Sequence, residues 1–554
     1  MYDQSTRSSD PWAPNVSSNV YSPLPEEEEV PSPVQTIVDT PTLPGEPAEK
    51  AATIRKALRR RLKGRTLIGL AAGGGAAVVG MLSLGELLSH PGVTLNQLAL
   101  TDSGASVAQI GHLLRRAGFG ATPGDLNAYG YLGFEGAVDR LLNYQQIDDS
   151  AMEQRLKELN FDLEKSPEDQ QRWWLLRMAW TKRPLLEKMT LFWHGVLTSS
   201  FRSVGEVFSR MMTQNDFLRT HAFDTFDNIL LGITADPAML IYLNLNDSTK
   251  YHPNENYARE LMELFTLGLG NYTQQDVFEA SAALTGWHVN DTGSFYNTFD
   301  HGDQMIRFLG KKGKFTYKDI IHTLTNHPRA PWFISKRLFT FFVHENPSAD
   351  DLKPLVDAYV RSKHNMGEVV RAMLLSPQFS SPQSYHSRVK SPVEFVVGVY
   401  RSLGLLGDGD GLHDVITRMG QTIFDPPNVA GWPGDKASSS WLNSGAWMTR
   451  LNYLDAILSS SNARGEGYMP LVNLQKLIST NKLSTPEKFV DFFSMFLLDG
   501  PLPGDRRKQV IDYLKSSSNA GYQRISLSGG KSYPLNRVRG ALYLMLAMPE
   551  YQLN

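Results

Sequence analysis

The chain has 554 residues, 55 Lys and Arg against 57 Asp and Glu, a formal net charge of −2, and no cysteine. This charge balance gives no basic field for nucleic acid, so we expect no nucleic-acid partner. The absence of cysteine excludes a thiol nucleophile, a disulfide framework and cysteine-ligated metal sites.

The first 54 residues form a tail rich in proline, serine and glutamate, with four consecutive glutamates from Glu26 to Glu29. Such a segment buries too little apolar surface to offset the entropy of ordering it. We therefore expect residues 1–54 to be disordered.

Residues 55–88 combine a basic flank with an apolar run. Seven lysines and arginines between positions 55 and 65 precede an uncharged stretch at 66–85. Twenty residues of helix span about 30 Å, the thickness of the hydrocarbon layer of a bilayer. This pattern predicts a transmembrane helix that contacts the membrane through residues 66–88. By the positive-inside rule the N-terminus is then cytoplasmic and the body extracytoplasmic.

Two other interpretations of the same run remain open. The sequence Arg59-Arg60-Arg61-Leu62-Lys63 is similar to a twin-arginine export signal, which would make the run a cleaved signal. A buried core helix is the third interpretation, and the one-sided basic flank argues against it.

From about residue 103 onward the apolar periodicity is helical, with stripes such as Val107, Ile110, Leu113 and Leu114. Short strands are expected only near 295–309, where glycine and aromatic residues interrupt the pattern. We therefore predict an all-α fold at 103–554, a large multi-helix body of two sub-bundles with long irregular loops.

The segment 253–268, PNENYARELMELFTLG, concentrates polar groups on one predicted helix. Pro253 suits its first position, and Gly268 or Gly270 suits its stop. At 100° per residue, Asn256, Arg259, Glu260 and Glu263 form one stripe. The stripe is either a solvated face or the wall of a polar site.

Three histidines have positions that suit a catalytic or metal-binding role. His194 lies at the edge of an apolar helix face, where a general base, a metal ligand or a structural histidine would lie. His112 lies opposite the apolar stripe of its helix. His301 lies in a loop between Asp300 and Asp303, which favours binding of a divalent metal.

Several segments resemble, in the same order, a bacterial family called domain of unknown function 1800. They are HLLRRAGFG at 112–120, MTLFWH at 189–194, the segment 253–268, ALTGW at 283–287, His301 ahead of FLG at 308–310, and PPNVAGWPG at 426–434. The resemblance spans residues 105–554. The chain departs from the family pattern at Val196 and Gly302, where another histidine and an aspartate are usual.

Signatures of serine hydrolases, phosphate-binding loops, dinucleotide folds and His-Glu-x-x-His zinc sites are missing from the sequence. We expect catalytic roles for His194, Glu260, Glu263 and His112. His194, His301 and Glu260 are the expected ligands of a divalent metal such as zinc, manganese or iron.

Two hypotheses of function follow. The first is a metal-dependent hydrolase with a His/carboxylate site. The second is a non-catalytic binding or assembly protein. The family resemblance implies a secreted sulfatase-like protein as partner under either hypothesis.

Overall fold

The computed structural model describes residues 106–205, 207–458, 472–517 and 523–554. The tail at 1–54 and the segment at 55–88 lie outside these ranges. The transmembrane helix of the predicted fold class is not supported: no helix in the described ranges is long and apolar enough to cross a bilayer.

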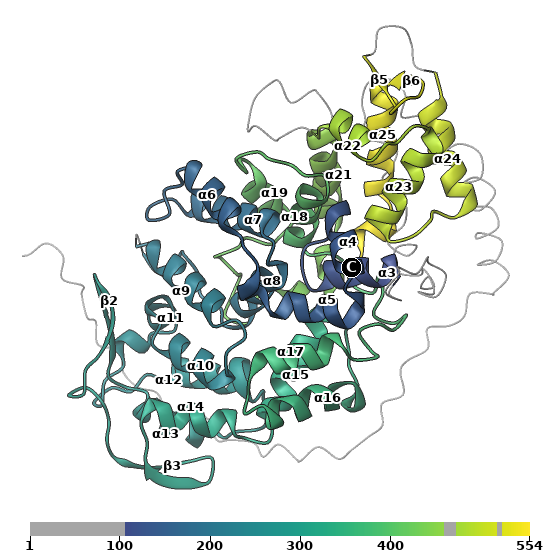
Figure 1. The fold of residues 1–554 in the computed structure, drawn as a ribbon. Coiled ribbons are helices and arrows are strands. Elements are labelled where there is room, and N and C mark those ends of the chain that lie inside the picture. The colour runs from purple at the N-terminus through teal and green to yellow at the C-terminus, as the bar shows by residue number, and fades with distance from the viewer. Residues whose placement is uncertain (1–105, 206, 459–471, 518–522) are drawn as a thin grey trace, which may run out of the picture. The chain divides into compact units, whose positions relative to one another are not determined.

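Helices make up most of the described chain (Figure 1). The N-terminal group comprises α3 (Val107–Arg116), α4 (Pro123–Gly130), α5 (Gly133–Leu142), η3 (Tyr144–Gln146), α6 (Ser150–Glu158), α7 (Pro167–Trp180), α8 (Pro184–Val196), α9 (Ser209–Thr220), α10 (Phe226–Thr234), α11 (Pro237–Tyr242), η4 (Leu245–Asp247), α12 (Glu255–Glu260) and η5 (Leu261–Thr266). The middle group comprises α13 (Gln274–Ala283), α14 (Tyr317–Thr325), α15 (Ala330–Phe342), α16 (Ala349–Arg361) and α17 (Met366–Leu374). The C-terminal group comprises α18 (Pro392–Ser402), α19 (Leu412–Arg418), α20 (Pro433–Lys436), η6 (Ser438–Trp441), α21 (Ser444–Leu458), α22 (Leu474–Thr480), α23 (Pro486–Leu498), α24 (Gly504–Lys515), α25 (Leu535–Leu546) and α26 (Pro549–Gln552).

Among the described residues, three antiparallel hairpins depart from the all-α prediction. They are β1 (Trp287–Asn290) with β2 (Gly293–Tyr296), β3 (Met305–Phe308) with β4 (Lys311–Lys314), and β5 (Arg524–Ser526) with β6 (Ser532–Pro534). The first two lie at or beside the region where strands were expected. The third was not expected, because strands of three residues show too little alternation to be recognised.

Buried apolar side chains form two large clusters within the described residues. One includes Trp193, Phe226 and Phe339 and is built mainly from the N-terminal and middle groups of helices. The other includes Trp174 and Phe489 and is built largely from the C-terminal group, with α6, α7 and α9. The helices α23, α24 and α25 lie together in yellow at the upper right of Figure 1.

The helix α8 contributes to both clusters and is buried along its whole length. Its two charged residues other than histidine are paired. Lys188 forms an ion pair with Glu394 of α18, and Glu187 forms ion pairs with Arg219 and Arg177. Burial opposes ionisation of Glu187, but the two guanidinium groups lower its pKa to about 2. Buried charges thus join α8 to its neighbours.

Candidate functional site

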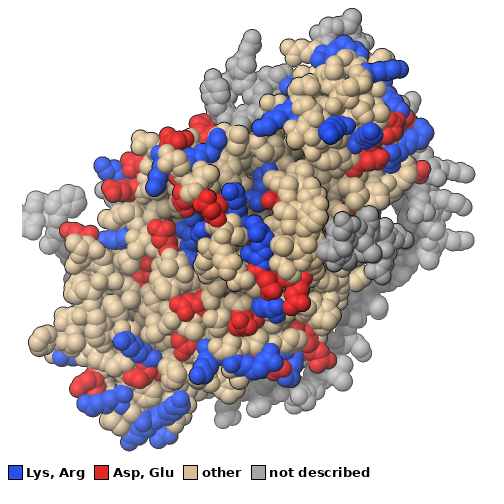
Figure 2. Space-filling view, in the orientation of Figure 1, with Lys and Arg blue, Asp and Glu red and all other residues tan. Residues whose placement is uncertain are grey.

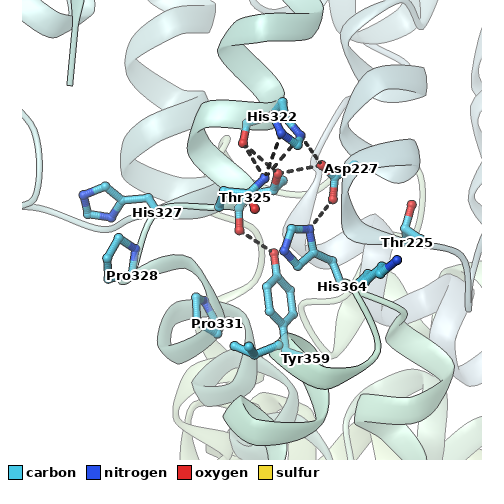
Figure 3. Close-up of a pocket in the computed structure, with 12 residues that line it drawn as sticks. Thr225, Asp227, His322, Thr325, His327, Pro328, Pro331, Tyr359 and His364 are labelled. Atoms are coloured by element: carbon cyan, nitrogen blue, oxygen red, sulfur yellow. Dashed lines mark hydrogen bonds and ion pairs between the residues drawn. The ribbon is translucent and has the colours of Figure 1, made fainter. Parts of the chain in front are cut away.

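A pocket of about 470 Å³ lies where α10, α14 and the turn after α16 meet (Figure 3). Its lining brings together several titratable side chains: Asp227, His322, His327, Tyr359, Lys363 and His364. We call this the Asp227 pocket. Such a convergence of polar groups in a concave site marks a candidate binding or active site.

The start of α10 places Asp227 in the pocket. The Thr225 hydroxyl caps the helix by accepting a hydrogen bond from the backbone N–H of Asn228. Asp227 therefore lies in the first turn, where the helix dipole favours a negative charge. The neighbouring Phe226 N–H donates to the carbonyl oxygen of His364 at 2.9 Å. This bond fixes the turn after α16 against α10.

The backbone of that turn is strained. Lys363 and His364 have φ values of 55° and 69°, in the left-handed region that favours glycine. An L-residue with a side chain costs on the order of 1 kcal/mol there. Strained residues of this kind cluster at functional sites. Here the conformation presents the His364 ring to Asp227.

The Asp227 carboxylate is shared among three groups (Figure 3). His364 Nδ1 donates to Oδ2 at 2.5 Å, and the Thr325 hydroxyl donates to Oδ1 at 2.7 Å. Nδ1 of His322 lies 3.5 Å from Oδ1. Because the carboxylate accepts from Nδ1 of His364, it favours the tautomer in which Nε2 carries the free lone pair.

Tyr359 holds the other side of the His364 ring. The two rings stack with centroids 4.5 Å apart and an interplanar angle of 22°. The Tyr359 hydroxyl donates to the carbonyl oxygen of Thr325 at 2.9 Å, and burial raises its pKa above the usual range. The His364 side chain is 15% exposed, whereas that of His322 is 73% exposed. His364 is thus a positioned imidazole and His322 a solvated one.

The structure places His194 elsewhere, in an aromatic box formed by Trp174, Phe424 and Trp432. Its Nε2 accepts a hydrogen bond from the backbone N–H of Phe424 at 3.0 Å. Burial lowers the pKa of His194 to about 3. The nitrogen that would bind a metal or take a proton is therefore already occupied.

His112 is also buried rather than presented to a cleft. Its Nε2 donates to the carbonyl oxygen of Phe379 at 2.9 Å. Burial first, and then the nearby charges of Arg115 and Arg116, lower its pKa well below the usual value. The helix face that appeared exposed from the sequence packs against the turn after α17.

His301 lies beside the first hairpin, with Nδ1 3.2 Å from the carbonyl oxygen of Thr285. The expected ligands His194, His301 and Glu260 are not brought together. Across the described ranges, no group of three or more His, Asp or Glu side chains lies in a geometry that could hold a metal ion.

The polar helix at 253–268 begins at Glu255, two residues later than expected. Pro253 precedes the cap Asn254, whose side chain accepts from the backbone N–H of Asn256 at 2.9 Å. The predicted stop is confirmed, because Gly268 follows the helix with φ of 79°. The second half of the segment, η5, is a π-helix. π-Helices are rare in proteins, and those that occur are often found at functional sites.

The stripe on this helix is half-buried. Arg259 pairs with Glu255 at 2.9 Å, and the Tyr272 hydroxyl donates to Glu263 at 2.9 Å. Burial, and then repulsion from Glu263, raise the pKa of Glu260. Glu260 and Glu263 therefore interact with each other, although neither contacts His112 or His194 in the described structure.

Sequence reasoning missed Asp227, His322 and His364 because they come from three distant segments. Asp227 and His364 are 137 positions apart. Asp227 resembles an ordinary acidic residue in a first helical turn. The one local signal is the Ser362-Lys363-His364-Asn365 turn between two helices, and it does not reveal which carboxylate the histidine meets.

The molecule is thus a largely helical protein with a histidine–aspartate pocket. The chain belongs to the family described as "Protein of unknown function (DUF1800)", whose model matches residues 112–553. The resemblance found in the sequence is confirmed. No curated protein and no solved structure gives a significant match to the chain.

Proposed function

We propose that the Asp227 pocket is an acid–base site and that the chain is a His/carboxylate hydrolase. The observation that carries the proposal is the 2.5 Å contact between Asp227 Oδ2 and His364 Nδ1 inside a pocket. A carboxylate that orients a histidine is the arrangement by which enzymes prepare a general base. The proposal keeps the reaction class expected from the sequence and moves it to other residues.

In this proposal Nε2 of His364 removes a proton from a water molecule, and the water oxygen attacks the electrophilic atom of an ester. Asp227 stabilises the imidazolium that forms. The bond between the electrophilic atom and the leaving oxygen then breaks, and the imidazolium returns the proton to that oxygen, so protons balance over the cycle. Lys363 and His322 line the same pocket and would attract an anionic substrate.

Hydrolysis of a panel of chromogenic carboxylate, phosphate and sulfate esters by the full chain tests this proposal. We expect His364→Gln to lower the rate on the most reactive ester by on the order of 100-fold or more. The matched control is His221→Gln, because His221 also pairs with an aspartate, Asp224 at 2.9 Å, and does not line the Asp227 pocket. Equal rates for wild type and His364→Gln, or no hydrolysis by wild type, would contradict the proposal.

A second candidate function is assembly, with a secreted sulfatase-like protein as the partner. The observation that favours it is that residues of the family motifs have structural roles. His112 and His194 each connect a helix to a distant loop through a hydrogen bond to the backbone. Co-elution of the two purified proteins in size-exclusion chromatography tests this candidate. Separate elution at micromolar concentration would oppose it.

We also infer an extracytoplasmic location for the body. The support is the one-sided basic cluster before residue 66, with Arg59-Arg60-Arg61 similar to a twin-arginine export signal.

A further inference from the structure

The hairpin of β3 and β4 carries an unusual concentration of positive charge. Along β3, Met305 and Arg307 are exposed, whereas Ile306 and Phe308 are buried. In β4, Lys311, Lys312 and Lys314 are exposed, and Lys318 follows on the first turn of α14. Figure 2 shows Lys and Arg side chains gathered at the lower left edge, where Figure 1 places β3.

The strand register places like charges opposite each other. Arg307 is directly across from Lys312, and Met305 is across from Lys314. Like charges in direct cross-strand positions destabilise a hairpin. One outer face therefore presents Arg307, Lys312 and Lys314 around the exposed Met305.

Two carboxylates near the hairpin accept hydrogen bonds from backbone groups rather than from its cations. Asp276 accepts hydrogen bonds from the backbone N–H groups of Leu309 and Thr273. Asp319 accepts from the N-cap Thr316. Lys314 forms an ion pair with Asp303, and both side chains are largely exposed. Within the described residues Arg307, Lys311 and Lys312 form no ion pair.

The positive charge of the hairpin contrasts with the formal net charge of −2 for the whole chain. A hairpin that concentrates unpaired cations against its own stability gains free energy when a polyanionic surface covers it. Apolar side chains lie beside the cations: Met305 is 56% exposed on the same face, and Phe299 is 81% exposed in the loop that leads into β3. Cations mixed with exposed apolar groups match the interface of an anionic bilayer.

We propose that the β3–β4 hairpin is a docking surface for anionic lipid headgroups. The cations contact the phosphates, and Met305 reaches the acyl boundary. Attachment through so few cations is reversible and weakens with salt.

Co-sedimentation of the full chain with vesicles tests this proposal. The probes are vesicles of phosphatidylglycerol and phosphatidylcholine in equal parts, and vesicles of phosphatidylcholine alone. Replacing Arg307, Lys312 and Lys314 by glutamine should lower the partition coefficient for anionic vesicles by on the order of 100-fold. Unchanged far-UV circular dichroism and melting temperature would show that the variant is folded.

The matched control replaces Lys157, Lys165 and Lys182, three exposed cations outside the hairpin, by glutamine. Both variants keep the basic cluster before residue 66, so its contribution cancels in the ratio. Equal vesicle binding by the two triple variants would overturn the proposal. A hairpin variant that loses heparin binding while vesicle binding stays unchanged would also overturn it, because the partner would then be an anionic polymer.

Discussion

The His194 imidazole is one of the buried polar groups that the helical body keeps neutral. It has an aromatic ring on three sides and accepts one backbone N–H. A charged imidazole would lose its hydration there without gaining an anionic partner. His112 and His386 are buried in the same way, and burial lowers the pKa of each.

This burial has a consequence for stability against pH. Because the folded pKa of His194 is about 3, below the ordinary value of 6.5, the folded state binds fewer protons than the unfolded chain. The contribution of the neutral His194 imidazole to the free energy of unfolding is complete above about pH 6.5. Below that pH the free energy of unfolding declines by up to about 1.4 kcal/mol per pH unit.

We therefore expect His194→Gln, whose amide oxygen replaces the acceptor for Phe424, to show a shallower loss of unfolding free energy between pH 6.5 and 4.5. Urea unfolding of both proteins at several pH values measures the two slopes. Parallel slopes would show that His194 does not titrate in this way. His112 and His386 are unchanged in the variant and contribute equally to both slopes.

At the scale of single elements, the polar helix at 253–268 shows which part of the sequence pattern was informative. Helical spacing gathers Tyr257, Ala258, Leu261, Leu264 and Phe265 on the side away from the polar stripe. All of them are buried except Leu264, which is partly buried. The helix stop at Gly268 was also predictable, because glycine adopts positive φ without strain. The π-helical half was not predictable, since its i→i+5 bonds leave no mark on residue spacing.

The same helix gives a prediction for Glu260. Because its pKa is raised by burial and by Glu263, the carboxylate contributes stability at low pH and loses it as the pH rises through the folded pKa. At pH 7 we expect Glu260→Gln to raise the free energy of unfolding by up to about 0.5 kcal/mol, since it removes a like-charge pair.

Thermal melting at pH 7 measures this effect. Glu263→Gln is the comparison, because its carboxylate accepts from the Tyr272 hydroxyl and its loss should be neutral or destabilising. If the free energy of unfolding of Glu260→Gln were more than about 1 kcal/mol below that of the wild type, Glu260 would be paired with a cation in solution.

At the scale of the whole molecule, the proposed extracytoplasmic location of the body rests on the N-terminal charge pattern. We expect residues from about 90 onward to be extracytoplasmic. In spheroplast experiments the body should appear in the osmotic-shock fraction or be degraded by added protease. Protection of the body from protease until the cells are lysed would reverse this assignment.

The helical class and the family were predictable because both depend on patterns repeated along hundreds of residues. The candidate site was not. His194, Glu260 and Glu263 attracted attention because their motifs are locally dense, yet His194 packs inside the body. Asp227 and His364 meet only through the tertiary contact of α10 with the turn after α16. No local pattern encodes that pairing.

The rate of ester hydrolysis by Asp227→Asn tests the central claim most directly. The amide cannot stabilise an imidazolium and does not enforce the Nδ1–H tautomer of His364. We predict a loss of on the order of 100-fold or more in kcat, with a much smaller change in KM. A kcat within about twofold of wild type, in a variant that is fully folded by circular dichroism, would contradict the claim that the Asp227 pocket is an acid–base site.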